Sequence, residues 1–591
     1  MQVSLDNRIG ALGQISQKKL LEILTKISGR KDFIIDNTLI KPLERIVGVS
    51  KLKAHGVDKI YRFEKGDIPF TNTQRVFFVS ADLITMKFVS DKINAEISQK
   101  NDGNSYHVIL VGRKLRSIVN MLENEGTYGY VSLHVFQWEL IKLDTKLLSL
   151  EQHTLFRSLF VEGDQSSLPS LAKSIWTMCM ILGRPPVTVV QGKYSHIVDN
   201  MVTRMFEELG KPSKEESEIG CMIIADRDLD YATPLLTGGT YSCLLDEVFG
   251  IKSGIVEMKD NKNNTPGGYF LNSADEVYSQ IKARHFSDVF PFLSAKTKEL
   301  NATRDKSKNM ELDEMKQFIS NELSVVTNFK KKLSYHISAC ESIITQMGRR
   351  YEGLQSAEQN ILECRNRRET MTYIEDCLSM NICDKYSILR LMCLMSIAQD
   401  GLFSDELQRL KLQFFHMFGY QHLSVFHSLE KAGICVEQAG LISTEVKGVN
   451  LANKVVQAVP LPTRRSTFTN FAQKLKLFPN LGESYELRNP TDPGYVFGGA
   501  YIPVLCQIVH QLSKREVPVD DLPKLLPNCS IRSSNVSDQN FRTFFVFVVG
   551  GVTYAEISAF QLIEKLCSCQ IVIASSSTIN GNIVIKSFFQ Q

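Results

Sequence analysis

The chain has 591 residues, of which 43% are hydrophobic and 22% are charged, a composition typical of a globular protein with a large core. Its formal net charge of +4 is too small for a general nucleic-acid-binding protein, so no nucleic-acid partner is expected. No apolar run approaches the roughly 18–20 residues that span a bilayer, and the first residues lack the apolar core of a signal peptide. We therefore expect a cytoplasmic protein whose 13 cysteines are reduced.

The first part of the chain alternates between strand-like and helix-like segments. Short runs rich in β-branched and aromatic residues occur at residues 57–63, 75–80 and 106–111, and a helical segment follows at residues 114–123. This alternation predicts a parallel sheet with helices on both faces. We assign residues 1–147 to a first α/β domain.

A second α/β domain is predicted from two separate parts of the chain. Residues 187–191 and 221–225 are expected strands, with a helix at residues 194–209 between them. Strand-like runs then return only at residues 543–549 and 570–574. We expect these late strands to complete the second sheet, so that residues 148–245 and 479–591 form one discontinuous domain.

Acidic residues follow the apolar strand at residues 221–225. Asp226 and Asp228 have the spacing of the nucleophile loop in haloacid-dehalogenase-type phosphotransferases, where Asp226 would attack phosphorus, Asp228 would act as general acid/base and Mg²⁺ would bridge them. That class usually has Thr or Val where Asp230 stands. The alternative is that Arg227 pairs with neighbouring carboxylates as a bidentate clamp, and we favour this structural interpretation.

Residues 246–478 are predicted to be almost entirely helical, and a long helix stands out within them. Residues 312–347 contain no Gly or Pro, and their apolar residues recur every three or four positions. A helix of this length would extend about 54 Å and needs a partner, for which residues 273–300 are suited. We expect a hairpin with its tip at residues 301–310. The expected seam consists of Leu312, Met315, Ile319, Leu323, Val326, Phe329, Leu333, Ile337, Cys340, Ile344 and Met347.

Motifs of common enzymes are missing from the sequence. There is no GxxxxGK[ST] phosphate loop, no GxGxxG after a strand, no HExxH and no GxSxG. His416, His422 and His427 are six and five residues apart, which does not stack metal ligands on one helix face. We therefore expect a protein that is not an enzyme, with no catalytic residues, no cofactor and no metal site.

The segment from residue 226 to residue 251 resembles the signature of the SM (Sec/Munc) family of SNARE-binding fusion proteins. Two departures occur, at Gly238-Gly239 and at Ser242-Cys243, and they predict a looser local turn. The residues that carry the resemblance are Asp226, Arg227, Asp230, Thr233, Pro234, Leu235, Leu236, Thr240, Tyr241, Asp246, Glu247, Gly250 and Ile251.

Further segments resemble the vacuolar-sorting branch of this family. They are found at residues 31–36, 41–46, 160–165, 336–343, 390–397 and 495–509, while residues 548–559 match the general SM pattern. The B-type form of the branch is favoured, and the alternative is the A-type subunit of the endolysosomal tethering complexes. The resemblance implies an arch of three domains, in which the helical domain comprises part 3a (residues 246–350, with the hairpin) and part 3b (residues 351–478).

The resemblance also implies a function and partners. The protein would bind syntaxin-type SNAREs and the assembled SNARE bundle, and promote SNARE assembly in vesicle fusion at late endosomes and lysosomes. A class-C-type helical-solenoid vacuolar sorting subunit would dock on part 3b, and association with membranes would be peripheral, through partners. The expected SNARE-binding residues at the hairpin tip are Arg304, Lys306, Lys308, Met310, Met315 and Phe318.

Overall fold

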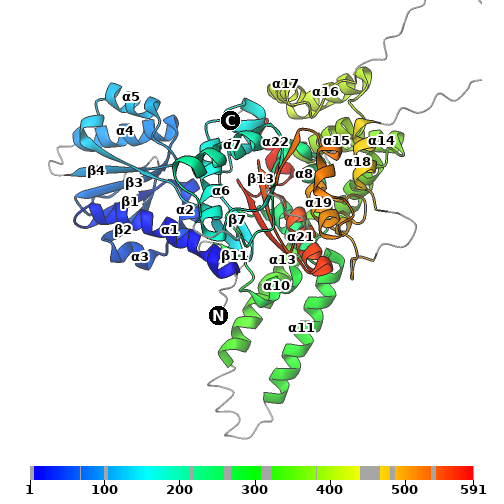
Figure 1. The fold of residues 1–591 in the computed structure, drawn as a ribbon, viewed down its shortest axis with the longest axis horizontal. Coiled ribbons are helices and arrows are strands. Elements are labelled where there is room, and N and C mark those ends of the chain that lie inside the picture. Colours follow the sequence, from blue (N-terminus) through cyan, green and yellow to red (C-terminus); the bar gives the residue numbers. More distant parts are fainter. Residues whose placement is uncertain are drawn as a thin grey trace, which may run out of the picture.

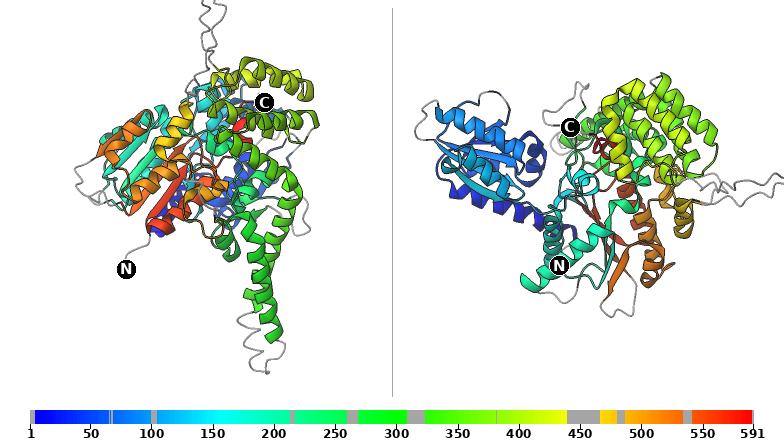
Figure 2. Two further views of the ribbon diagram at one scale, coloured as in Figure 1. Left: turned by 90° about the vertical axis from the view of Figure 1, so that its right-hand side faces the viewer. Right: turned by 90° about the horizontal axis from the view of Figure 1, so that it is seen from above.

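A computed structural model of the protein describes residues 5–64, 66, 68–98, 104–212, 217–258, 268–307, 323–380, 382–438, 466–479, 486–533 and 541–589. These residues fold into an α/β unit, a second α/β unit in the middle and a helical unit from which two long helices project (Figure 1). Figure 2 shows the same row of units from two further directions. The predicted fold class, with two parallel-stranded sheets and a large helical insertion, is confirmed.

The first sheet has five parallel strands in the order β2-β1-β3-β4-β5. Three of them coincide with the expected strands, whereas β1 and β5 were not predicted. The strands are β1 (Lys31–Ile35), β2 (Val57–Arg62), β3 (Gln74–Ser80), β4 (Ser105–Val111) and β5 (Val131–Phe136).

Helices cover both faces of the first sheet. Alternate residues of each strand point to opposite faces, so each face carries apolar side chains that pack against helices. Phe77 and Val79 of β3 face α4 and α5, while Val76 and Phe78 belong to the core on the other face. The helix α1 also reaches the second unit, where its residues Ile9 and Leu12 are buried. The helices are α1 (Leu5–Lys26), α2 (Ile40–Ile46), α3 (Val49–Ala54), α4 (Leu83–Ser98) and α5 (Arg116–Asn124).

The second sheet has seven strands in the order β12-β8-β9-β13-β14-β7-β6. The five central strands are parallel, and an antiparallel strand lies at each edge. The expectation that the last strands complete this sheet is confirmed, since β13 pairs with β9. The strands are β6 (Ile141–Asp144), β7 (Leu147–Ser149), β8 (Val187–Gln191), β9 (Cys221–Asp226), β12 (Cys529–Ser533), β13 (Thr543–Val549) and β14 (Gln570–Ser575).

Both faces of this second sheet are also buried. Met222 and Ile224 of β9 pack in the core shared with α6 and α7, while Ile223 and Ala225 face the core shared with α19 and α21. Strands buried on both faces read as continuous apolar runs, which explains the residue pattern of β9 and β13. The helices are α6 (Leu168–Leu182), α7 (Lys193–Glu208), α19 (Val504–Ser513), α20 (Leu522–Leu525), α21 (Tyr554–Cys567) and α22 (Gly581–Lys586).

The helical unit lies between β9 and β13 in the sequence. It also contains a short antiparallel pair, β10 (Ile255–Val256) with β11 (Tyr269–Phe270). Its helices are α8 (Ala232–Leu235), α9 (Tyr241–Phe249), α10 (Glu276–Ile281), α11 (Phe286–Ser307), α13 (Leu323–Leu362), α14 (Arg367–Met380), α15 (Lys385–Ala398), α16 (Ser404–Phe418), α17 (Leu423–Lys431) and α18 (Thr467–Leu475).

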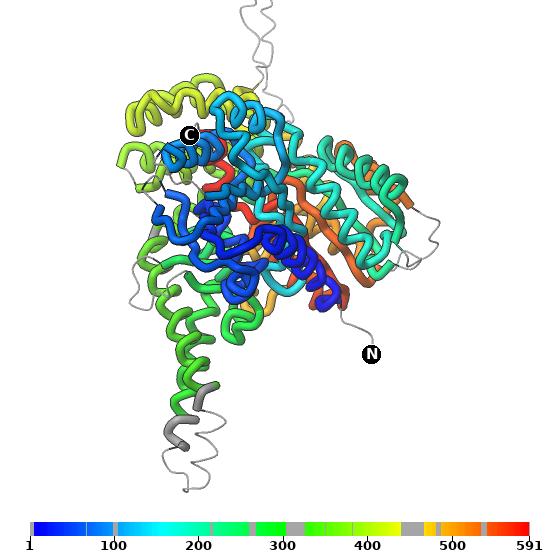
Figure 3. Tube along the Cα trace, turned by 90° about the vertical axis from the view of Figure 1, so that its left-hand side faces the viewer, coloured from blue at the N-terminus to red at the C-terminus, as the bar shows by residue number. Residues whose placement is uncertain are grey.

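The long helices α11 and α13 lie side by side and project from the body as a hairpin (Figure 3). The predicted helical pair is therefore present, but α11 continues to Ser307, through most of the segment 301–310 that was expected to form the tip. The seam also differs in detail. Ile344 was expected in the seam and is 53% exposed, whereas its neighbour Ile343 is buried. The buried residues along this side of α13 include 333, 336, 340, 343 and 347. Residues 336 and 343 are therefore buried where Ile337 and Ile344 were expected, a shift of one residue. The segment 312–322 lies outside the described residues.

The helix α13 is interrupted at Gly348, directly after the predicted end of the long helix at Met347. Gly348 has φ +45° and ψ −139°, a backbone conformation that only glycine adopts without strain. The break separates the hairpin from the part of α13 that joins the rest of the helical unit. The hairpin thus leaves the body at a defined residue.

Candidate functional site

The signature segment lies where the second sheet meets the helical unit, next to α8 in Figure 1. Within it, Arg227 directly follows β9 and is buried. Its Nη1 donates to both carboxylate oxygens of Glu556 at 2.9 Å each, and its Nη2 donates to the backbone oxygen of Asp230 at 2.8 Å. Such a two-oxygen contact is among the strong ion pairs of proteins. A clamp by Arg227 is therefore present, and Glu556, its main partner, is 329 residues away in sequence.

Glu556 lies in the first turn of α21 and is held there by a reciprocal cap. Its Oε2 accepts a hydrogen bond from the backbone N–H of Thr553 at 2.9 Å, while the Thr553 hydroxyl accepts one from the N–H of Glu556 at 3.1 Å. This capping box fixes the carboxylate that receives Arg227. The Thr-x-x-Glu spacing was visible in the sequence, but its link to Arg227 was not.

Asp226 ends β9, and its carboxylate lies at the start of α7. Oδ2 accepts a hydrogen bond from the N–H of Tyr194 at 2.7 Å, and Oδ1 accepts from the N–H and the hydroxyl of Ser195 at 2.8 and 2.5 Å. Burial raises the pKa of Asp226 to about 7, although the hydrogen bonds from Ser195 lower it. Because both oxygens are engaged with α7, this arrangement does not favour Asp226 as a nucleophile.

Asp230 joins three segments. Its carboxylate accepts hydrogen bonds from the N–H and the hydroxyl of Thr233 at 2.9 and 2.5 Å, which fixes the start of α8. It also accepts from the N–H of Val504, the first residue of α19, at 3.1 Å and from the Tyr501 hydroxyl at 3.3 Å. Pro234, the next signature residue, is buried within α8.

A second buried arginine lies on the other side of α8. Arg390 of α15 forms an ion pair with Glu247, donates from Nε to the backbone oxygen of Leu235 at 3.0 Å, and donates from Nη2 to the Thr237 hydroxyl at 3.1 Å. The Glu358 carboxylate of α13 accepts hydrogen bonds from the N–H and the hydroxyl of Thr237 at 2.9 and 2.7 Å. Burial raises the pKa of Glu358 to about 7, although Arg390 lowers it.

The signature residue Tyr241 connects α9 with the hairpin. Its hydroxyl lies 2.8 Å from Nδ1 of His336 on α13, and Nε2 of His336 lies 3.0 Å from Oδ2 of Asp275. Asp275 also caps α10 by accepting from the N–H of Val277 at 2.9 Å. Burial raises the pKa of Asp275, but the contact with His336 outweighs it and lowers the pKa to about 2. The hairpin is therefore tied to the signature segment through His336 and through the N–H of Phe286 in α11, which donates to the backbone oxygen of Gly239 at 2.8 Å.

The remaining signature residues hold α9 against its neighbours. The Thr240 hydroxyl lies 3.3 Å from the Ser558 hydroxyl of α21. Asp246 accepts hydrogen bonds from the N–H of Ile251 at 2.8 Å and from the side-chain amide of Asn580 at 2.9 Å. Burial raises the pKa of Asp246 to about 7.

The turn that departs from the family signature is closely packed rather than loose. A Cβ atom at Gly238 would lie 2.7 Å from Sγ of Cys243, and one at Gly239 would lie 2.6 Å from Nε2 of His285. The N–H of Gly239 also donates to the backbone oxygen of Val496 at 2.7 Å. The two departures thus complement each other, because the side chain of Cys243 occupies the space beside Gly238.

The expected SNARE-binding residues can be placed only in part. The backbone at Arg304 and Lys306 belongs to α11, while Lys308, Met310, Met315 and Phe318 lie outside the described residues. Among the described hairpin residues, large apolar side chains are exposed at Phe290, Val325 and Ile344. Lys298 on α11 and the pair Lys330 and Lys331 on α13 are exposed as well.

Exposed apolar side chains also gather at the outer end of the helical unit, on α16, α17 and the short connection between them. Tyr420 is 59% exposed and Leu423 is 62% exposed, and Leu412 and Met417 on α16 are exposed too. We call these four residues the α16–α17 patch. Exposed apolar surface of this kind is a candidate for contact with another protein.

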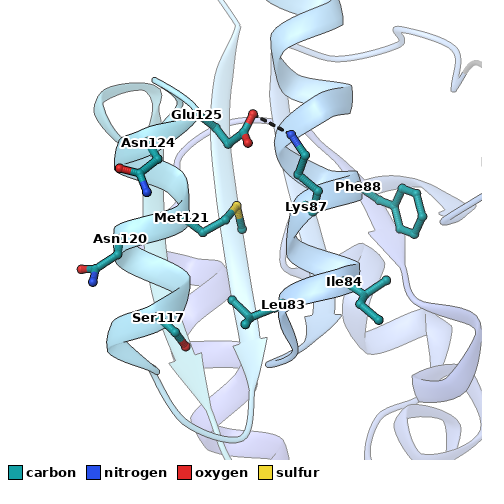
Figure 4. A pocket seen from close by; sticks show the side chains of 9 residues that line it. All are labelled: Leu83, Ile84, Lys87, Phe88, Ser117, Asn120, Met121, Asn124 and Glu125. Atoms are coloured by element: carbon teal, nitrogen blue, oxygen red, sulfur yellow. Dashed lines mark ion pairs between the residues drawn. The ribbon is translucent and has the colours of Figure 1, made fainter.

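A groove of about 610 Å³ lies on the first α/β unit, between α4 and α5. Figure 4 shows Leu83, Ile84 and Phe88 on α4 and Met121 on α5, with Lys87 and Glu125 forming an ion pair at 2.7 Å across the groove. Ile84 is 72% exposed. Asn120, Asn124 and Ser117 provide polar groups along the α5 side.

Within the described part of the chain, no cluster of three or more His, Cys, Asp or Glu side chains is arranged to hold a metal ion. Likewise, none of its helices is both long and apolar enough for a transmembrane span.

Comparisons with known proteins agree on one family. The model of the Sec1 family matches residues 31–587. Vacuolar protein sorting-associated protein 33B of Rattus norvegicus is 33% identical over 591 residues, covering 96% of this chain and 95% of the relative. Vacuolar protein sorting-associated protein 33A of the same organism is 26% identical, with 99% and 98% covered. The greater similarity to the B-type protein agrees with the resemblance found in the sequence.

Solved structures share the fold at low sequence identity. The Unc18–syntaxin 1 complex of Monosiga brevicollis has a TM-score of 0.61 and 14% identity, covering 100% of this chain and 99% of that chain. Sly1p in complex with an N-terminal peptide of Sed5p has a TM-score of 0.58 and 14% identity, with 98% and 97% covered.

Proposed function

Because the chain belongs to the Sec1 family, the family of SM proteins, we propose that it binds SNARE proteins and promotes their assembly into a bundle. The observation that carries this proposal is the projecting hairpin of α11 and α13. Val325, Lys330 and Lys331 are exposed along it at a distance from the break in α13, whereas Phe290 and Ile344 are exposed near its foot. Similar structures were solved as complexes, Unc18 with syntaxin 1 and the SM protein Vps45 with the Qa SNARE Tlg2. The proposed sites of action are late endosomes and lysosomes, in keeping with the vacuolar-sorting relatives.

The mechanism follows from the cost of ordering flexible chains. SNARE segments that fold on binding lose conformational freedom, and this loss opposes assembly. A rigid helical pair that holds two segments in register lowers the cost of adding the rest. The exposed Phe290 and Ile344 would provide apolar contacts, and Lys330 and Lys331 would attract acidic helix surfaces. No covalent step is required.

We assign the groove between α4 and α5 to a terminal peptide of the syntaxin-type SNARE. It has apolar side chains at Leu83 and Met121 between the two helices, with Ile84 and Phe88 on the outer side of α4 (Figure 4) and polar groups on its α5 side. These features suit a short segment with one apolar anchor and backbone groups that need partners. The hairpin and the groove would then bind different parts of the SNARE partners.

Calorimetric titration with the assembled SNARE bundle and with separate SNARE segments tests the proposed role of the hairpin in SNARE assembly. We expect the bundle to bind more tightly than any segment, and Lys330→Glu/Lys331→Glu to weaken bundle binding about tenfold through lost charge attraction. A reversal at the predicted tip, Lys306→Glu/Lys308→Glu, should act in the same direction. Lys18→Glu, an exposed change on α1, is the matched control and should have no effect.

The same titration tests the proposed binding of the terminal peptide in the groove, with a variant of the groove in place of the hairpin variants. Ile84→Glu should weaken binding of a syntaxin-type chain that carries its terminal peptide, while leaving bundle binding unchanged. Equal affinity of the folded protein for free segments and for the bundle would contradict the assembly role. Loss of bundle binding in Ile84→Glu would contradict the proposal that the hairpin and the groove bind different parts of the SNARE partners.

We further propose that part 3b, residues 351–478, binds a class-C-type helical-solenoid subunit through the α16–α17 patch. Tyrosine is among the side chains that carry much of the binding energy at the centre of an interface. Removing exposed leucine surface from water adds hydrophobic stabilisation. This patch is at the outer end of the helical unit, away from the hairpin (Figure 1). Both proteins could therefore bind at once.

Replacing Tyr420 and Leu423 together with glutamate should abolish stable co-purification of the solenoid subunit, with a loss in affinity of at least about 30-fold. The measurement is analytical size exclusion with the purified subunit, followed by titration. Leu566→Glu is the matched control, because Leu566 is also an exposed leucine but lies on α21. An unchanged complex with the double variant would place the interface elsewhere.

A further inference from the structure

Two cysteines of the helical unit lie in contact. Sγ of Cys377, near the end of α14, is 3.3 Å from Sγ of Cys383, in the segment that leads to α15. Both side chains are buried, but the residues around them are at the surface, since Met380 and Ile382 are exposed. The pair is thus buried but lies next to exposed residues of the same segment.

The surroundings make the two thiols unequal. The Cys377 thiol donates a hydrogen bond to Cys383 and thereby lowers the pKa of Cys383 to about 7, against the opposing effect of burial. Tyr373 lies nearby, with its hydroxyl 3.9 Å from Sγ of Cys383, and the positive charge of Arg350 acts in the same direction. Cys383 is therefore the more easily deprotonated thiol of the pair, and Cys377 lies within reach of its sulfur.

We propose that Cys377 and Cys383 form a reversible dithiol–disulfide pair that is oxidised by hydrogen peroxide. The pair differs from a lone buried thiol because the resolving sulfur is already in van der Waals contact with the reactive one. Oxidised cysteines with such a partner end as disulfides rather than as higher oxides. This inference concerns a modification site and does not depend on SNARE binding.

The reaction proceeds in two balanced steps. The Cys383 thiolate attacks one peroxide oxygen, so that an S–O bond forms, the O–O bond breaks and the departing hydroxide takes up a proton to become water. Sγ of Cys377 then attacks Sγ of Cys383, the S–O bond breaks, and the second hydroxide leaves as water with the thiol proton. In total, two thiols and one peroxide give a disulfide and two waters, with sulfur oxidised and peroxide reduced.

The disulfide would alter the foot of the hairpin. Its formation brings the sulfur atoms from 3.3 Å to about 2.05 Å, which moves the segment of Cys383 toward α14. The backbone oxygen of Ile382 in this segment accepts a hydrogen bond at 3.3 Å from Nη1 of Arg350, two residues beyond the break at Gly348. Oxidation would therefore act on the part of α13 that adjoins the hairpin.

Peptide mapping of the full-length protein after treatment with hydrogen peroxide tests the proposal. We expect a peptide lighter by two hydrogen atoms that links Cys377 to Cys383 and returns to the dithiol with dithiothreitol. Cys364, an exposed cysteine, is the internal reference and should form no intramolecular disulfide under the same conditions. Oxidation of Cys364 while both paired thiols stay free would overturn the proposal.

Two variants separate the roles of the sulfurs. In Cys377→Ser, oxidation should stop at the sulfenic acid of Cys383, which a cyclic diketone probe labels. In Cys383→Ser, Cys377 should resist peroxide, because it lacks the reactive neighbour. Circular dichroism shows whether each variant is folded, and mapping of the unmodified protein decides the question even if one is not. A disulfide that forms only in denaturant would count against the proposal.

Discussion

Replacing Arg227 with methionine should lower the free energy of unfolding by about 3–5 kcal/mol, because the change leaves Glu556 buried without its cation. The loss includes the hydrogen bond to the backbone oxygen of Asp230, which would also become unsatisfied. Urea denaturation followed by circular dichroism measures the effect. The surface pair of Arg365 and Glu363 supplies the control, since Arg365→Met should cost no more than about 1 kcal/mol.

A double variant shows whether the effect comes from the pair. Replacing Glu556 by leucine together with Arg227→Met removes both charges and should recover part of the lost stability, because no unpaired charge remains buried. The remaining deficit would reflect the lost cap of α21. If Arg227→Met were as mild as Arg365→Met, the clamp would not be a principal link between β9 and α21.

Replacing Arg390 with methionine should also cost about 3–5 kcal/mol at pH 7.5, and here the loss should depend on pH. The change leaves Glu247 without its ion-pair partner and removes the cation that lowers the pKa of Glu358. Glu358 has a pKa of about 7 in the folded protein, above its ordinary value, so the folded state binds more protons than the unfolded state below that pH. Stability associated with Glu358 therefore falls as pH rises toward 7.

Without Arg390 the pKa of Glu358 should rise further, and the fall in stability should extend above pH 7. The variant should thus lose more stability between pH 6 and pH 8 than the unmodified protein, by up to about 1.4 kcal/mol per pH unit. Denaturation curves at the two pH values measure this difference. Adding Glu358→Gln to the variant should remove the extra pH dependence, and equal pH slopes for all three proteins would contradict the argument.

Strands buried on both faces were the most predictable part of the fold. The runs that form β8, β9 and β13 are mostly apolar, and polar residues such as Gln191 and Asp226 mark their ends. The strands β6, β7 and β12 are short or only partly buried, so they leave no comparable pattern. Their position depends on tertiary packing, which local sequence does not reveal.

In the hairpin, the spacing of apolar residues did not determine which of them are buried. Spacings of three and four fit more than one set of positions, so Ile344 could replace Ile343 in the expected seam.

The contacts of the signature segment could be predicted only in part, for a different reason. Its own residues were found, but Glu556, Glu358 and Arg390 come from distant parts of the chain, and no single-sequence pattern pairs them with Arg227 or Thr237.

The pairing of β9 with β13 has a consequence for biosynthesis. Asp226 lies opposite Val549, so the ribosome adds more than 300 residues after β9 before its partner strand exists. At about 5–20 residues per second, β9 waits for some 15–65 s with one edge unpaired. Unpaired edges of apolar strands invite association with other chains, so we expect the nascent protein to need chaperones during this interval. Chains that stop before β13 would never close the central sheet.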